Sequence, residues 1–273
     1  MKVLFVGDIT GRPGRSALAS YLSECHRRNI NYDFVIANVE NAAGGFGLTK
    51  EISQKISSYG VDCQTSGNHI WDRKDILSYF EVEPRLLRPA NYPPGVAGLG
   101  YNIYKTRNGE PVAVINLQGR IFMYDIDCPF RTADRILAEI SKDVKLIFVD
   151  FHAEATSEKQ ALGYYLDGRV SAVFGTHTHV QTADEHILPH GTAFISDVGM
   201  SGPYASVIGV RVEDALQRLL QAVPNKFNIA EEDPRMAAVA VTVDPGTGKA
   251  SAIDRIMFRS EGEEEPADRQ RRF

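Results

Sequence analysis

Histidines follow apolar runs at several places in this sequence. His69 closes the segment TSGNH, His152 closes VKLIFVDFH, and His177 and His179 follow VFG in the triplet His-Thr-His. Side chains two residues apart point to the same side of an extended segment, so both rings of the triplet are expected to face one partner. Because imidazole is the commonest metal ligand among side chains, the triplet favours a metal site over two isolated histidines.

Oxygen-bearing side chains occupy equivalent positions after other apolar runs. Asp8 follows KVLFVG, Glu40 and Asn41 follow DFVIANV, and Asn68 precedes His69. Taken singly, Asp8 can be a helix N-cap, and the two asparagines can be turn residues. Taken together, these residues and the histidines end separate strand-like segments, and the carboxyl ends of strands in an open α/β sheet form one ligand-binding rim. The pattern therefore predicts that they meet at one edge.

The elements that must position these residues alternate in the first half of the chain. Apolar runs at 2–6, 33–37 and 61–65 predict strands, and the spacing of apolar residues at 15–28 and 50–59 predicts helices between them. Such alternation is typical of parallel βαβ units. We therefore expect a parallel sheet here.

The second half is richer in predicted strands. They are 100–106 and 111–117, joined around Asn108-Gly109, then 144–152, 170–179, 192–196, 237–243 and 250–258. Ser157 and Gln160 have capping-box spacing and predict the start of a helix that ends at Gly168. Antiparallel hairpins are expected to dominate this half. The fold class is therefore α/β, a sandwich of two mixed β-sheets flanked by helices, with a single domain at 1–258 and a charged tail at 259–273.

Composition narrows the class of protein. The formal net charge of −5 argues against a broad basic surface for nucleic acid, and no apolar run is long enough for a membrane helix. Cys25, Cys63 and Cys128 are few and widely spaced, which excludes a disulfide framework and fits a reducing cytoplasm. The apolar run at the N-terminus is too short for a signal peptide. We expect a cytoplasmic protein, and the sequence leaves a homo-oligomer open.

Taken in order, these motifs resemble those of the calcineurin-like metallophosphoesterases. The segments NVENAAGGFGLT, TSGNHIWD, NLQGRIFM, VDFHAEATSEK and GTHTHVQTAD resemble the YmdB-type branch of bacteria more closely. The resemblance covers the chain from Met1 to about Phe258. Thr10 stands where the superfamily usually has a ligand histidine, and Glu40 stands where it has a bridging aspartate, as in that branch.

The resemblance implies a metallophosphoesterase fold with two metal ions that share the Glu40 carboxylate. The side chains implied for one ion are Asp8, Asn41 and His179. Those implied for the other are Asn68, His152 and His177. His69 is implied to be the general acid. Nitrogen and oxygen ligands without thiolate suit two transition-metal ions per chain, iron or manganese first and zinc or cobalt next.

The activity implied is that of a phosphodiesterase for 2′,3′- or 3′,5′-cyclic nucleotides, with attack by metal-bound hydroxide. A phosphomonoesterase and a regulatory nucleotide-binding protein remain alternatives. A dinucleotide-dependent oxidoreductase is disfavoured because GDITGRPG at 7–14 is not GxGxxG. Arg12 or Arg120 could contact a phosphate, and aromatic residues could stack on a base; those considered are Phe46, Phe122 and Tyr124.

Overall fold

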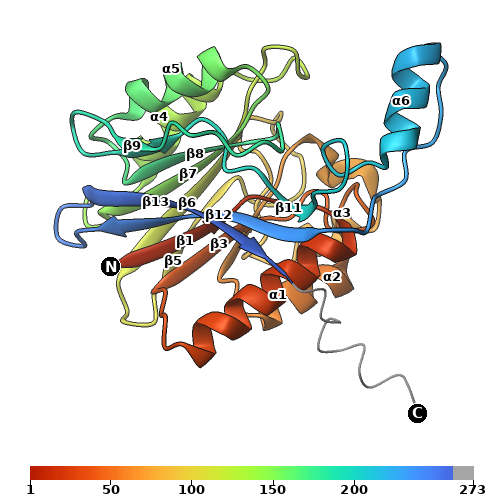
Figure 1. Ribbon diagram of the computed structural model, residues 1–273. Helices are drawn as coiled ribbons and strands as arrows, with labels where there is room; N and C mark the ends of the chain where they lie inside the picture. Colours follow the sequence, from red (N-terminus) through yellow and green to blue (C-terminus); the bar gives the residue numbers. More distant parts are fainter. Residues whose placement is uncertain (261–273) are drawn as a thin grey trace.

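Two β-sheets pack face to face in the computed structural model, which describes residues 1–260 (Figure 1). Helices α1 (Gly11–Arg27) and α2 (Lys50–Ser58) cover the outer face of one sheet. Helices α4 (Pro129–Glu139) and α5 (Thr156–Leu166) cover the outer face of the other. The expected α/β sandwich of two mixed sheets flanked by helices is confirmed.

The first sheet is built around strand β1. Its order is β2 (Asp8–Ile9), β11 (Met200–Pro203), β12 (Pro234–Val243), β1 (Lys2–Val6), β3 (Phe34–Asn38) and β4 (Cys63–Thr65), with β13 (Ala250–Arg259) paired to β12. Strands β1, β3 and β4 are parallel, as predicted for the first half of the chain. Strand β12 runs antiparallel to β1 and brings the C-terminal hairpin into this sheet.

The second sheet corrects the expectation for the second half. Its order is β5 (Tyr101–Lys105), β6 (Pro111–Gln118), β7 (Leu146–His152), β8 (Ala172–Thr176), β10 (Ala193–Ile195) and β9 (His186–Ile187). The four central strands are parallel, and only β5 and β9 are antiparallel to their neighbours. Parallel neighbours need a crossover, which α4 and α5 supply after β6 and β7. Helix α4 was not predicted.

Both faces of the central strands are buried, which explains their unbroken apolar runs. In β1, Leu4 and Val6 face α1 and α2, whereas Val3 and Phe5 face the second sheet. The ring centroids of Phe5 and Phe174 lie 4.4 Å apart across the gap between the sheets. This contact fixes the two sheets against each other.

Two helix starts differ from the sequence-based expectation. Helix α1 begins at Gly11, ahead of the predicted start at residue 15, because Pro13 is tolerated in a first turn whose N–H groups lack helical acceptors. The capping-box prediction for α5 is wrong. Its N-cap is Ala155, without a side-chain hydrogen bond, and Ser157 lies inside the first turn. Its end before Gly168, at a φ of 77°, is as predicted.

The segment after Phe258 begins as part of the fold. Arg259 ends β13, and the Ser260 N–H donates to the Pro234 carbonyl at 2.9 Å. The remainder of the predicted tail, 261–273, lies outside the described residues. No helix within residues 1–260 is long and apolar enough to cross a bilayer. Cys25, Cys63 and Cys128 are unpaired.

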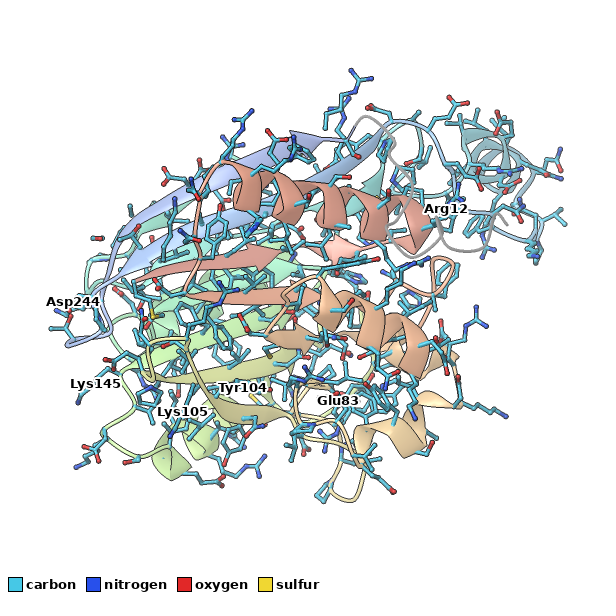
Figure 2. The ribbon with its side chains drawn as sticks, turned by 90° about the horizontal axis from the view of Figure 1, so that it is seen from below. Arg12, Glu83, Tyr104, Lys105, Lys145 and Asp244 are labelled. Atoms are coloured by element: carbon cyan, nitrogen blue, oxygen red, sulfur yellow. The ribbon has the colours of Figure 1, made fainter. Side chains whose placement is uncertain are left out.

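The carboxyl ends of the parallel strands share one end of the molecule. Arg12, just beyond β1 and β2, lies at that end (Figure 2). Lys145, which precedes β7, and Asp244, which follows the antiparallel β12, lie at the opposite end (Figure 2). Figure 1 also shows α6 (Val212–Gln221) projecting from the body, away from both sheets.

Helix α1 approaches β11 so closely that only glycine fits at position 14. A Cβ on Gly14 would lie 2.1 Å from the Ser201 carbonyl oxygen. We expect Gly14→Ala to reduce the free energy of unfolding by about 1–3 kcal/mol, because the helix must move off the sheet. Denaturant unfolding measures this. The control is Gly246→Ala, where the nearest atom to the new Cβ is 3.4 Å away; equal losses in both variants would contradict the account.

Candidate metal centre

The predicted ligands converge from both sheets at the Arg12 end. Asp8 lies in β2, and Glu40 and Asn41 follow β3. Asn68 and His69 begin the 3₁₀ helix η1 (Asn68–Asp72) after β4. His152 ends β7, and His177 and His179 follow β8. Asp8, Glu40, Asn41 and His152 are buried.

One group of side chains meets at the ring of His152. Its Nε2 lies 3.1 Å from Glu40 Oε1, 3.2 Å from Asn68 Oδ1 and 3.0 Å from His177 Nδ1. Ligand atoms of Glu40, His152 and His177 all lie within 4.8 Å of one another. Three imidazole and carboxylate groups this close can bind one metal ion, with the Asn68 oxygen as a further ligand.

A second group of side chains also contacts Glu40 Oε1. The Asn41 Nδ2 donates to Glu40 Oε1 at 3.1 Å and lies 3.3 Å from His179 Nε2. Asp8 contacts residues of the first group: its Oδ2 accepts the His177 N–H at 3.1 Å, and its Oδ1 is 3.7 Å from His152 Nδ1. Burial raises the pKa of Asp8, against the smaller effects of the charges of His152 and His179, which both lower it. Glu40 therefore contacts both groups, as a bridging ligand would.

The buried oxygens and the charges of the site favour the binding of a cation. Asp8 Oδ1 and Asn41 Oδ1 are buried, and within the described chain neither has a hydrogen-bond partner. A buried oxygen without a partner is unfavourable, and a metal ion would satisfy both. Burial alone would lower the pKa of His152, but Glu40, then Asp8 and Asp150, raise it to about 9. The surroundings therefore stabilise positive charge at this point.

A hydrogen-bonded chain orients the His152 ring. Its Nδ1 lies 3.0 Å from Thr176 Oγ1, and that hydroxyl donates to Asp150 Oδ1 at 2.7 Å. Asp150 is buried and also accepts a hydrogen bond from Asn38 Nδ2 at 2.9 Å. With its own proton committed to Asp150, Thr176 accepts the proton of His152 Nδ1. Nε2 is thus the ring nitrogen left for a metal.

The triplet His177-Thr178-His179 is not extended, so that expectation was wrong. His177 has a φ of 102° and His179 a φ of 65°, both in the left-handed region. Such conformations are costly for residues with a Cβ and cluster at functional sites. They turn His177 toward His152 and His179 toward Asn41, instead of both toward one partner.

A buried ion pair holds the triplet in this conformation. The Asp197 Oδ2 accepts the Thr178 N–H at 3.0 Å and the Thr178 hydroxyl at 2.7 Å. The same oxygen lies 2.7 Å from Lys159 Nζ, and both charged side chains are 2% exposed. Sequence analysis missed Lys159 and Asp197. The sequence signal that could have indicated this ion pair is Lys159 in VDFHAEATSEK, which lies on the buried face of α5.

His69 is placed differently from the predicted ligands. Its backbone N–H donates to Glu40 Oε2 at 3.0 Å, while its ring Nδ1 lies 2.9 Å from Asp72 Oδ2. The side chain is 34% exposed, and its ring packs edge-on against Phe46. The ring can therefore reach a molecule bound beside the cluster. Thr10 forms no part of the cluster and packs against Gly202 and Gly209.

The close packing of the ligands requires glycine at position 67. A Cβ there would lie 2.2 Å from His152 Nε2 and 2.5 Å from Glu40 Oε2. We expect Gly67→Ala to displace one or both ligands and to lower the metal content after loading, measured by elemental analysis. Gly246→Ala is the control. Full metal occupancy in Gly67→Ala would show that this approach is not needed.

Comparison with known proteins agrees with these observations. The family described as YmdB-like protein matches residues 4–256. A 2′,3′-cyclic-nucleotide 2′-phosphodiesterase of Bacillus subtilis (strain 168) is 47% identical over 96% of this chain and 98% of its own.

Two solved structures share the fold. A hypothetical protein from Thermus thermophilus is 43% identical, with a TM-score of 0.89 over 95% of this chain and 100% of its own. A novel phosphatase from Mycoplasma pneumoniae is 32% identical, with a TM-score of 0.88 over 99% of this chain and 96% of its own. Family match, identity and fold agree with the resemblance of the motifs, and the chain belongs to the YmdB-like family of metallophosphoesterases.

Proposed function

We propose that this protein is a metal-dependent phosphodiesterase that hydrolyses cyclic nucleotides, with 2′,3′-cyclic nucleotides as the first choice. The observation that carries the proposal is that two groups of predicted ligands meet at Glu40 beside His69. Within the described residues, the buried Asp8 Oδ1 and Asn41 Oδ1 among them have no hydrogen-bond partner. The 47% identity to a 2′,3′-cyclic-nucleotide 2′-phosphodiesterase supports the choice of substrate. By this analogy the bond to the 2′ oxygen is the one that breaks.

We assign two metal positions to the two groups. Glu40 is shared, and one position is completed by Asp8, Asn41 and His179. The other is completed by Asn68, His152 and His177. Two such ions bind phosphoryl oxygens and make a nucleophile available at neutral pH. Iron or manganese suits these ligands best, followed by zinc or cobalt.

The remaining chemistry is assigned to His69. Departure of the 2′ oxygen requires a proton, and the partly exposed His69 ring can deliver one from Nε2. The Asp72 carboxylate, 2.9 Å from Nδ1, holds the ring in place. A protein that only binds nucleotides would not need this pair, which favours an enzyme over a regulatory binding protein. The unpaired cysteines fit our proposal that the reaction takes place in the cytoplasm.

A substrate panel with metal analysis tests the function. We expect about two transition-metal ions per chain and hydrolysis of 2′,3′-cyclic AMP that a chelator abolishes and added metal restores. Turnover should exceed that of 3′,5′-cyclic AMP, and bis-p-nitrophenyl phosphate should be cleaved faster than p-nitrophenyl phosphate. The opposite preference between the two nitrophenyl esters would favour a phosphomonoesterase. Binding of cyclic nucleotide without turnover in the metal-loaded protein would favour the regulatory alternative.

Substitution of His69 tests its role as acid. We expect His69→Gln to keep both metal ions but to lose ~10²–10⁴-fold in kcat on a poor leaving group, the usual contribution of general acid catalysis. His190→Gln is a matched control, since His190 Nδ1 also pairs with a carboxylate, Asp167 Oδ2, at 2.8 Å, but away from the cluster. Loss of metal from His69→Gln would instead make His69 a ligand.

A further inference from the structure

A cavity of about 570 Å³ beside α4 concentrates positive charge. Within the described chain its lining includes four arginines and, as its one carboxylate, Asp127. The arginines are Arg88, Arg120, Arg131 and Arg135. No part of the proposed phosphodiester chemistry uses these side chains.

The buried arginine of this cavity has no counter-charge. Arg88 is 9% exposed, and its guanidinium donates to the carbonyl oxygens of Pro89, Val96 and Ala97 at 2.8–3.2 Å. Within residues 1–260 no carboxylate pairs with it, and burial lowers its pKa. Carbonyl groups orient a guanidinium without neutralising it, and two of its five N–H donors remain for a ligand. An anion in the cavity would complete this site.

The other three arginines add charge to the same space. Arg120, Arg131 and Arg135 are exposed, and none makes a hydrogen bond or ion pair through its side chain with any described residue. Arg131 and Arg135 are one turn apart on α4, so they face the cavity together and repel each other. The first turn of α4 contains no acidic residue and Cys128 provides no side-chain cap, so its free N–H groups add to the positive potential.

The cavity wall is continuous with the candidate metal centre. Tyr92 lines the cavity, and its hydroxyl donates to Gln118 Oε1 at 3.3 Å. Gln118 pairs with His152 across β6 and β7, and the next residue, Gly119, donates its N–H to the His152 carbonyl at 2.9 Å. The Tyr92 ring also lies 5.3 Å from that of Trp71, on the same 3₁₀ helix as His69. Tyr92 and Gln118 therefore connect the lining of the cavity to the strand end that carries His152.

We propose that this cavity binds a second phosphate of the substrate, on the 5′ side of the nucleoside whose cyclic phosphate is hydrolysed. Arginine forks match phosphate oxygens in geometry and charge, and a cavity of this volume accommodates a nucleotide-sized group. A cyclic mononucleotide lacks such a phosphate, whereas an oligoribonucleotide that ends in a 2′,3′-cyclic phosphate has one. The inference rests on the proposed function and makes RNA ends of this kind the preferred substrate class.

The test compares adenosine 2′,3′-cyclic phosphate with and without a 5′-phosphate, using the metal-loaded protein. We expect the 5′-phosphate to lower KM at least about tenfold, the equivalent of one charge-assisted hydrogen bond. In the double variant Arg131→Ala/Arg135→Ala the ratio of the two kcat/KM values should fall toward one, because only Arg88 and Arg120 remain in the cavity. The control Lys142→Ala/Lys145→Ala removes two positive charges beyond the other end of α4 and should keep the wild-type ratio.

Three outcomes would overturn the inference. The first is a wild-type ratio near one, and the second is a ratio that the arginine double variant leaves unchanged. The third is that free inorganic phosphate stimulates the turnover of the cyclic mononucleotide in the wild type and the control but not in the arginine double variant. That result would make the cavity an effector site.

Failure of the proposed function gives a different result, since neither cyclic nucleotide would then be hydrolysed. Calorimetric binding of 5′-AMP to wild type and double variant decides the cavity's role in that case. Weaker binding by the double variant supports a phosphate site, and equal binding contradicts it.

Discussion

The interaction of the buried Glu40 carboxylate with His152 is the one on which the rest of the structure depends. Burial alone would raise its pKa, yet His152 and His69 hold that pKa well below its usual value, so the group stays charged. A charge without solvent persists only when its surroundings supply partners. Glu40 belongs to the first sheet and His152 to the second, so these partners meet only if the sheets pack in one relative position. The Phe5–Phe174 contact and its neighbours set that position.

Dense packing of the predicted ligands around one carboxylate is accompanied by unusual backbone geometry. Gly67 passes too close to His152 and Glu40 for any side chain, and His177 and His179 adopt left-handed conformations. Neither condition would arise from local preference, so tertiary contacts must impose both. The buried pair of Lys159 and Asp197 does so for the histidines. A buried ion pair adds little net stability, but here it specifies one conformation of the loop, because Asp197 also binds Thr178.

These contacts mark the limit of what the sequence could predict. The unbroken run KVLFV identified a strand covered on both faces, and residues after several such strands identified the edge where the ligands meet, because both patterns are local. The predicted direction of the His177 and His179 rings was wrong because the prediction assumed an extended backbone. Asp197, which holds the bent triplet, lies 19 residues after Thr178. Asp150 and Lys159 escaped notice because their roles depend on contacts between distant segments. Helix α4 was missed, and its Ala133 and Ile136 are buried against the second sheet, which is a contact between distant segments.

The distribution of charge is compatible with the proposed action of an acidic protein on an anionic substrate. In the proposed centre, Asn41 and Asn68 would supply ligand oxygens without adding negative charge, so Asp8 and Glu40 would only partly neutralise two divalent ions. Such a centre would attract a phosphate although the chain carries a net charge of −5. The arginine cavity produces the same sign of potential by another route, with a guanidinium that carbonyl groups orient but do not neutralise. With the proposed metal ions in place, the local charge at both places is positive although the net charge of the chain is negative. Both places lie next to the carboxyl ends of β6 and β7. A substrate with one phosphate would bind at the proposed metal centre alone, whereas a substrate with two phosphates would bind at the metal centre and in the arginine cavity.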